Sequence, residues 1–389
     1  MQKVIMHWRQ IVYSFCGLKL LTMLFPGWGT GIGGDFLSWT IGANLVFQTI
    51  STGKLPPLST YGIYLGIEIV LAPFYWLWTI LPVEHPNVNF ATLDQRTIPA
   101  ISLIFLMKIP IFLFDIVTLI LLMRIVRHVS NSEQKSIAAG LTWFVNPYNF
   151  YILYFFGAMD IIAIGFFLLA LNFELEGRWF RCGIATILSA LLRIYALAVY
   201  PFFIPLMKTK SSRTSLILGS AMPVAFAIGL LYLSGDTLAT VFNIPAKEFW
   251  LLEFLGFNVL GMQFIRWSPV LMIFQLYVVA RFWRRDTNII YLASVSLLAL
   301  LLGATLYGGE AQHFLWVCPL LSACIAMHPE DLWTYILTFF TALLSPTVNP
   351  FYVWTPEPVV LDTFLAGAFY AMKATYLLRI NLWNLRLSR

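Results

Sequence analysis

Seven polar or aromatic residues interrupt an otherwise apolar sequence at places where they could act on a ligand. They are Asp35, Asp160, Arg193, Tyr195, Gln312, His313 and Trp316. A carboxylate can take the proton from an attacking hydroxyl group. A guanidinium carries a fixed charge and can hold a phosphate through two parallel hydrogen bonds. These residue types therefore predict chemistry in which a hydroxyl attacks and a phosphate leaves.

Each of these residues also has a simpler structural interpretation. Asp35 could be a solvated loop carboxylate, and Asp160 could be the N-cap of a helix. Arg193 could be a packing residue paired with a carboxylate. Gln312 and His313 could be ordinary interfacial residues. The functional prediction therefore depends on whether the surrounding elements bring these side chains together.

The composition of the chain predicts a membrane protein. Of its 389 residues, 60% are hydrophobic and 11% are charged, whereas soluble proteins carry about 25% charged residues. Apolar runs such as Ile98–Met123 and Thr214–Leu233 reach the length of roughly 20 residues that a helix needs to cross a bilayer. The runs are continuous rather than alternating, which predicts helices and not strands. We expect an all-α, polytopic bundle that forms one transmembrane domain over residues 1–389.

Charge and cysteine patterns exclude several other classes. The net charge of +6 comes from basic residues in short clusters between apolar runs, a pattern typical of topology signals and not of nucleic-acid binding. The four cysteines show no metal-ligand spacing and predict no disulfide framework. The first apolar run ends without a small-residue cleavage site, so we expect it to remain as a membrane anchor.

The basic clusters also orient the chain, because short cytoplasmic loops are rich in Lys and Arg. Placing every cluster in the cytoplasm requires residues 61–81 to lie in the interface, and it makes residues 29–97 one large external loop with interfacial helices. It also requires Gly183–Met207 to form two short half-helices that meet near Arg193. The bundle then has about 12 spans, with both termini cytoplasmic. The remaining predicted spans are 137–154, 158–173, 214–234, 267–281, 287–307, 313–327, 332–347 and 359–380.

This topology gathers the unusual polar residues on the external face. Asp35, Asp160, Arg193 and the segment 312–316 all lie there, although only Lys and Arg were used to orient the chain. An external carboxylate near a cation suits the inverting transfer of a sugar from a lipid-linked donor. Asp35 would be the general base and Arg193 would bind the donor phosphate. His313 is the rival base, since its ordinary pKa of about 6.5 suits proton transfer.

A transporter or lipid flippase is the alternative function. Such a protein would place charged residues near the middle of the bilayer, within repeated halves. The sequence shows no internal repeat and no obvious charge pair at that depth. Asp115, an acid inside a predicted span, is expected to make a structural contact with Arg124 or with an asparagine such as Asn146.

The order of several short motifs resembles the catalytic subunit of GPI mannosyltransferase I and its prokaryotic relatives, in the GT-C superfamily. That family shows a loop acid after the first span, a span with an internal Asp, an Asn-Pro, a Gly-x-x-Asp, a basic residue before Ile-Tyr, and a Gln-Tyr-Phe-x-Trp. The corresponding elements cover about residues 30–327, in the same order. They are Asp35, Phe114-Asp115-Ile116-Val117-Thr118, Asn146-Pro147, Gly157-Ala158-Met159-Asp160, Arg193-Ile194-Tyr195 and Gln312-His313-Phe314-Leu315-Trp316.

The resemblance implies a GT-C-like mannosyltransferase with an external active site. The donor would be a dolichyl- or polyprenyl-phosphate sugar and the acceptor a lipid-linked molecule or glycolipid. Besides Arg193, the implied substrate-binding residues are Asp160, Tyr195, Gln312, His313 and Trp316. The protein would be multi-pass, in the cell membrane of a prokaryote or the endoplasmic reticulum membrane of a eukaryote.

The chain departs from the family pattern at three positions. The family's first-loop Asp-x-Asp is Gly33-Gly34-Asp35 here, His313 replaces a Tyr, and Arg193 replaces a Lys. A lone carboxylate is a poor site for Mg²⁺ or Mn²⁺, which take several oxygen ligands. We therefore expect no metal cofactor.

Overall fold

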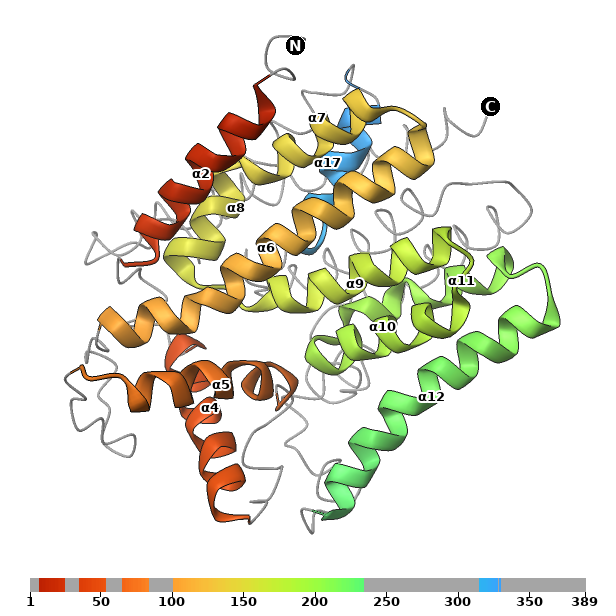
Figure 1. Cartoon of the computed structure of the whole chain (residues 1–389). Helices are drawn as coiled ribbons and strands as arrows, with labels where there is room; N and C mark the ends of the chain where they lie inside the picture. The colour runs from red at the N-terminus through yellow and green to blue at the C-terminus, as the bar shows by residue number, and fades with distance from the viewer. Residues whose placement is uncertain are drawn as a thin grey trace, which may run out of the picture.

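The computed structural model describes residues 7–24, 35–53, 65–83, 101–233, 315–327 and 329. Within these ranges all regular structure is helical, which confirms the predicted all-α class for this part of the chain (Figure 1). The elements are α2 (Trp8–Thr22), α4 (Asp35–Thr52), α5 (Leu65–Ile80), α6 (Ile101–Ser130), α7 (Glu133–Phe144), α8 (Pro147–Phe150), the π-helix η3 (Tyr151–Phe156), α9 (Asp160–Leu175), α10 (Trp179–Leu192), the 3-10 helix η4 (Ile194–Ala198), α11 (Tyr200–Leu206), α12 (Lys210–Leu233) and α17 (Cys318–Met327).

The long helix α6 runs through the middle of the described bundle. Its 30 residues correspond to about 45 Å, more than the roughly 30 Å of a bilayer core. In the described ranges it is the helix that is both long and apolar enough to cross a membrane, while α10 and α17 are apolar but shorter. The bundle of about 12 spans remains a prediction.

Neighbouring helices pack around α6 in a row that Figure 1 follows from α7 through α6, α9 and α10 to α12. Small residues permit the close approaches. A side chain at Gly140 of α7 would meet Met123, and one at Gly165 of α9 would meet Phe114. Ser132 caps the start of α7 by accepting a hydrogen bond from the amide of Lys135. The core therefore depends on small residues where helices touch.

The chain breaks and turns back at Arg193, as the sequence predicted. α10 ends at Leu192, and Arg193 itself is extended, with φ −155° and ψ 122°. The segments η4 and α11 follow, and the Tyr200 hydroxyl reaches Ser220 Oγ at 2.9 Å. Ser220 in turn lies against Gly183 of α10. The two short segments therefore place the chain after α11 beside the beginning of α10.

Helices α4 and α5 form a hairpin inside the segment that we predicted to be external. They pack where Glu68 lies directly on Gly42, and the rings of Phe47 and Tyr75 are 6.3 Å apart. The 16 residues of α5 span about 24 Å. The interfacial placement of residues 61–81 remains a prediction. The start of α5 touches the end of α10, because a side chain at Gly66 would meet Leu192. This contact brings the hairpin beside the break at Arg193.

Candidate functional site

Asp160 is the centre of the candidate site and opens α9. The chain reaches it through Gly157, whose positive φ of 80° ends the π-helix η3 and turns the backbone into the next helix. Met159 holds the N-cap position, and no side chain caps α9. The interpretation of Asp160 as a helix cap is therefore wrong. Its carboxylate is buried, with 1% of the residue exposed, and it points to partners on other segments.

The carboxylate of Asp160 is held by a guanidinium and an indole. Arg193 Nη2 donates to Oδ2 at 3.3 Å, and Arg193 Nε lies 3.1 Å from Oδ1. Trp316 Nε1 donates to Oδ1 at 3.1 Å. Arg193 is therefore paired with a carboxylate, as its structural interpretation anticipated. The pair is electrically balanced, so neither charge is buried alone.

Aromatic rings surround this ion pair. Tyr195 meets Trp316 edge to face with ring centroids 5.4 Å apart, and Phe167 lies 6.1 Å from the same indole. Tyr148, just after the Asn146-Pro147 motif, lies near enough to Asp160 to experience its charge. Sequence reasoning missed Tyr148, although the neighbouring Asn-Pro pair marked its position. Burial among these rings lowers the local dielectric constant and strengthens the electrostatic contacts inside.

The structure thus brings together four of the seven predicted site residues from three distant parts of the chain. Asp160, Arg193, Tyr195 and Trp316 form one contiguous cluster. The other three predictions, which are the side chain of Asp35 and residues Gln312 and His313, lie outside the described residues.

A second buried ion pair lies inside the bundle, between α2 and α6. Lys19 Nζ lies 2.6 Å from Asp115 Oδ2. Asp115 also accepts hydrogen bonds from Trp143 Nε1 at 2.8 Å and from the Tyr154 hydroxyl at 2.8 Å. The ammonium sits 3.3 Å from the centre of the Phe144 ring, a cation–π contact. Both carboxylate oxygens of Asp115 are thus engaged.

This arrangement corrects two expectations from the sequence. Asp115 pairs with Lys19 and not with Arg124, which is exposed, or Asn146, whose side chain caps the amide of Tyr148. Asp115 stands in the middle of α6. A charge pair within an apolar bundle is therefore present, contrary to the prediction that there was none. The signal was Lys19, a lone base inside the first apolar run.

The π-helix η3 connects the two polar clusters. The Tyr154 hydroxyl binds Asp115, and the Tyr154 carbonyl accepts a hydrogen bond from the buried Lys108 Nζ at 2.6 Å. Asp160 follows only six residues later. Single π-turns are frequent at functional sites because they displace the helical register. Here the π-turn fixes the direction in which the chain enters Asp160.

Glu68 is a third buried acid, on α5 near the break at Arg193. It is 5% exposed, and its Oε2 has no hydrogen-bond partner within the described ranges. Burial raises the pKa of Glu68 to about 8 because the apolar surroundings disfavour the charged form. The carboxyl group is therefore mostly protonated at neutral pH.

The described residues contain no group of three or more His, Cys, Asp or Glu side chains that could hold a metal ion. That the proposed chemistry needs no metal cofactor stays a prediction. Asp35, an acid that could take part in a metal site, has its side chain outside the described residues.

Comparison with known proteins gives no relative from which a function could be taken. No protein family, no curated protein and no solved structure matches this chain.

Proposed function

We propose that this protein is an integral membrane glycosyltransferase of the GT-C type. It would move a sugar, with mannose as the first candidate, from a dolichyl- or polyprenyl-phosphate donor to a lipid-linked or glycolipid acceptor on the external face. The observation that carries the proposal is the cluster of Asp160, Arg193, Tyr195 and Trp316. These residues come from separate motifs whose chain order resembles that family.

The proposed reaction needs a base and a cation. Asp35 takes the proton from the acceptor hydroxyl, whose oxygen forms a bond to the anomeric carbon of the donor sugar. The bond from that carbon to the phosphate oxygen breaks, and the polyprenyl phosphate leaves with the electron pair. Attack from the face opposite the leaving group inverts the anomeric configuration.

Arg193 can serve this reaction while it is paired with Asp160. A guanidinium has five N–H donors. Arg193 Nη2 donates to Asp160, and Nε lies 3.1 Å from the same carboxylate. Asp160 thereby fixes the orientation of a group whose charge we propose to offset that of the departing phosphate. Tyr195 and Trp316 form the aromatic wall of the site, and Gln312 and His313 belong to the same segment as Trp316.

A transfer assay tests the proposal directly. Purified protein is incubated with radiolabelled polyprenyl-phosphate-mannose and a panel of lipid acceptors, and lipid extracts are separated by chromatography. The expected result is a mannosylated lipid that is absent when Arg193 is replaced by Gln. Absence of transfer with mannose, glucose and other polyprenyl-phosphate sugars, by protein that remains folded, would contradict the proposal.

A transporter or lipid flippase is the second candidate, favoured by the Lys19–Asp115 pair. Charged residues buried at mid-helix frequently mark the path of a solute or proton. Proteoliposomes distinguish the two functions, because a flippase moves a fluorescent polyprenyl phosphate between leaflets without changing it. Robust movement without any transfer product would favour this second function.

A further inference from the structure

Tyr154 in η3 is held by two charged side chains of α6. Lys108 Nζ donates to the Tyr154 carbonyl at 2.6 Å, and Asp115 Oδ2 accepts a hydrogen bond from the Tyr154 hydroxyl at 2.8 Å. Because Lys108 and Asp115 are seven residues apart, they lie about two turns apart on one face of α6. α6 therefore fixes both the backbone and the side chain of Tyr154.

Lys108 caps the end of a helical segment. α8 and η3 follow each other directly from Pro147 to Phe156, and Tyr154 stands in their last turn. The last carbonyls of a helix have no donor within the helix, and a cation at this end meets the negative end of the helix dipole. Lys108 is 0% exposed, so the carbonyl that it binds is satisfied away from water.

The capped end leads directly into Asp160. Gly157, with φ 80°, turns the backbone, and the Ala158 amide donates to the Ile152 carbonyl at 3.1 Å. Two residues after Ala158, Asp160 opens α9 with its carboxylate on Arg193. A shift of the capped carbonyl would therefore move this turn and the carboxylate that follows it.

We propose that Lys108 is a positioning residue that sets the place of the Asp160 carboxylate and, through it, the orientation of the Arg193 guanidinium. Its ammonium group acts on the backbone of η3. In the proposed reaction, the result is a cation held in a fixed place for the donor phosphate. The effect on donor binding rests on the proposed function, whereas the effect on the Asp160–Arg193 pair does not.

A comparison of double-mutant cycles tests the effect on the ion pair. Melting temperatures in detergent are measured for Asp160→Asn, Arg193→Gln and the double variant, first in the wild-type protein and then with Lys108→Met present. The coupling is the amount by which the loss in the double variant falls short of the sum of the two single losses. A carboxylate that is held less firmly contributes less to its pair, so Lys108→Met should reduce the coupling by at least about half.

The transfer assay gives a second readout. Lys108→Met should raise the KM for the polyprenyl-phosphate donor about tenfold, since a misplacement of about 1 Å can cost up to about 100-fold. The KM for the acceptor should not change. Lys108→Arg keeps a cationic N–H donor for the carbonyl and should restore most of the coupling and of the donor affinity.

One control variant removes the same kind of contact elsewhere. Lys135 Nζ also donates to a carbonyl, that of Met327, at 3.4 Å. Lys135→Met should leave both the coupling and the donor KM unchanged.

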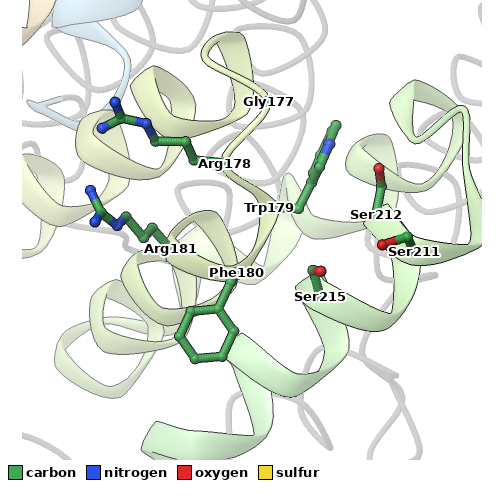
Figure 2. A pocket seen from close by; sticks show the side chains of 8 residues that line it. All are labelled: Gly177, Arg178, Trp179, Phe180, Arg181, Ser211, Ser212 and Ser215. Carbon is green, nitrogen blue, oxygen red and sulfur yellow. The ribbon is translucent and has the colours of Figure 1, made fainter.

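A second control lies beyond the turn at the other end of α9, where Gly177 has φ 70°. Arg181 follows this turn, with its guanidinium carbon 5.9 Å from the centre of the Phe173 ring. Figure 2 shows the Arg181 side chain on the far side of the α10 start from Ser211 and Ser215. Arg181→Met removes a cation beside α9 without touching the Asp160 end, and should change neither readout.

Three results would overturn the proposal. The first is unchanged coupling in Lys108→Met, and the second is an equal loss of coupling in Lys135→Met or Arg181→Met. The third is a raised donor KM with unchanged coupling, which would show that Lys108 acts on the donor by its charge. If Lys108→Met does not fold, Lys108→Gln, whose amide ends one bond short of the ammonium, takes its place with the same expectations.

Failure of the proposed function would look different. Absence of transfer by the wild-type protein would count against glycosyl transfer alone, because the coupling between Asp160 and Arg193 is measured without a substrate.

Discussion

The ion pair between Asp160 and Arg193 has both a structural and a chemical role in our proposal. With side-chain exposures of 1% and 9%, removal of one partner leaves the other charge buried and unpaired. Such losses typically cost about 3–5 kcal/mol, whereas removal of both partners costs much less. A double-mutant cycle can therefore separate folding from binding.

Asp160→Asn and Arg193→Gln should each lower the melting temperature strongly. The double variant should lose less stability than the sum of the losses in the two single variants. Thermal unfolding in detergent measures this. The double variant should nevertheless fail to bind the polyprenyl-phosphate donor, because the cation is gone. Arg178→Gln, which breaks the exposed pair with Glu176, is the control and should change stability by about 1 kcal/mol or less. Full donor binding by the double variant would assign the pair to structure alone.

Asp35→Asn tests the general base. The amide keeps the volume of the side chain and cannot accept the proton, so turnover should fall about 10²–10⁴-fold while donor binding survives. The transfer assay and donor binding are measured on the same preparation. Near-normal turnover in Asp35→Asn together with an inactive His313→Ala would assign the general base to His313.

Transfer activity should also persist in EDTA. Loss of activity in EDTA and its recovery with Mn²⁺ would show a metal site that includes acids other than Asp35.

Glu68 should make the stability of the protein depend on pH. Its pKa in the folded protein, about 8, lies above the ordinary value of 4.5, so between these values the folded state binds more protons than the unfolded state. Stability therefore falls as the pH rises from 4.5 to 8, by up to about 1.4 kcal/mol per unit of pKa shift. Glu68→Gln should remove this fall and raise the melting temperature at pH 8 but not at pH 5. The exposed Glu133→Gln on α7 is the control and should leave the pH profile unchanged.

At the scale of elements, contact between α10 and α12 depends on glycine. A side chain at Gly219 would lie 2.0 Å from the carbonyl oxygen of Phe180, and one at Gly183 would lie 2.4 Å from that of Leu216. Backbone atoms cannot rotate away as side chains do. The two helices therefore approach more closely than any larger residue at these positions would permit.

Gly219→Ala should consequently separate α10 from α12 and lower the melting temperature, with a cost of about 1–3 kcal/mol for overpacking. Gly229→Ala is a matched control in the same helix, since nothing lies within 4 Å of that position. Helix propensity alone should make Gly229→Ala neutral or stabilising by up to about 1 kcal/mol. Equal stability of the two variants would contradict the close packing.

Local features of the sequence predicted secondary-structure elements better than they predicted which side chains touch. The break at Arg193 could be predicted because the basic clusters at both ends of a short apolar run require the chain to return to the side from which it entered. For Arg193 and Asp160, the sequence predicted only that both residues lie on the same face of the bundle, and not that they touch. The Lys19–Asp115 pair was missed, because its residues are 96 positions apart and many pairings satisfy a buried acid equally well. Tyr148 could have been found from the Asn146-Pro147 pair before it, whereas no spacing or charge pattern marks Glu68 as buried.

At the scale of the whole molecule, the topology is the central prediction. Asp160 at the start of α9 and Arg193 after the end of α10 touch, so these ends lie on one side of the bundle. The basic residues at the end of α6 should face the opposite side, in the cytoplasm.

Cysteine labelling measures this topology in a variant without the four native cysteines. A cysteine at Ser130, at the end of α6, should resist an impermeant maleimide added to intact cells and react after permeabilisation. A cysteine at Thr52, which is exposed at the end of α4, should react in intact cells. Labelling of Ser130→Cys from outside would show that residues 61–81 cross the membrane and that the assignment of sides is wrong.

The pairing of Lys19 with Asp115 also sets an order of events during synthesis. The ribosome makes the lysine 96 residues before the aspartate, an interval of roughly 5–20 s at ordinary elongation rates. In the proposed topology the first helix carries an uncompensated ammonium group during that time, and its insertion into a bilayer costs about 3 kcal/mol. The first helix therefore gains its final position only after α6 has emerged. Its anchoring through this ion pair must therefore wait until α6 has been made.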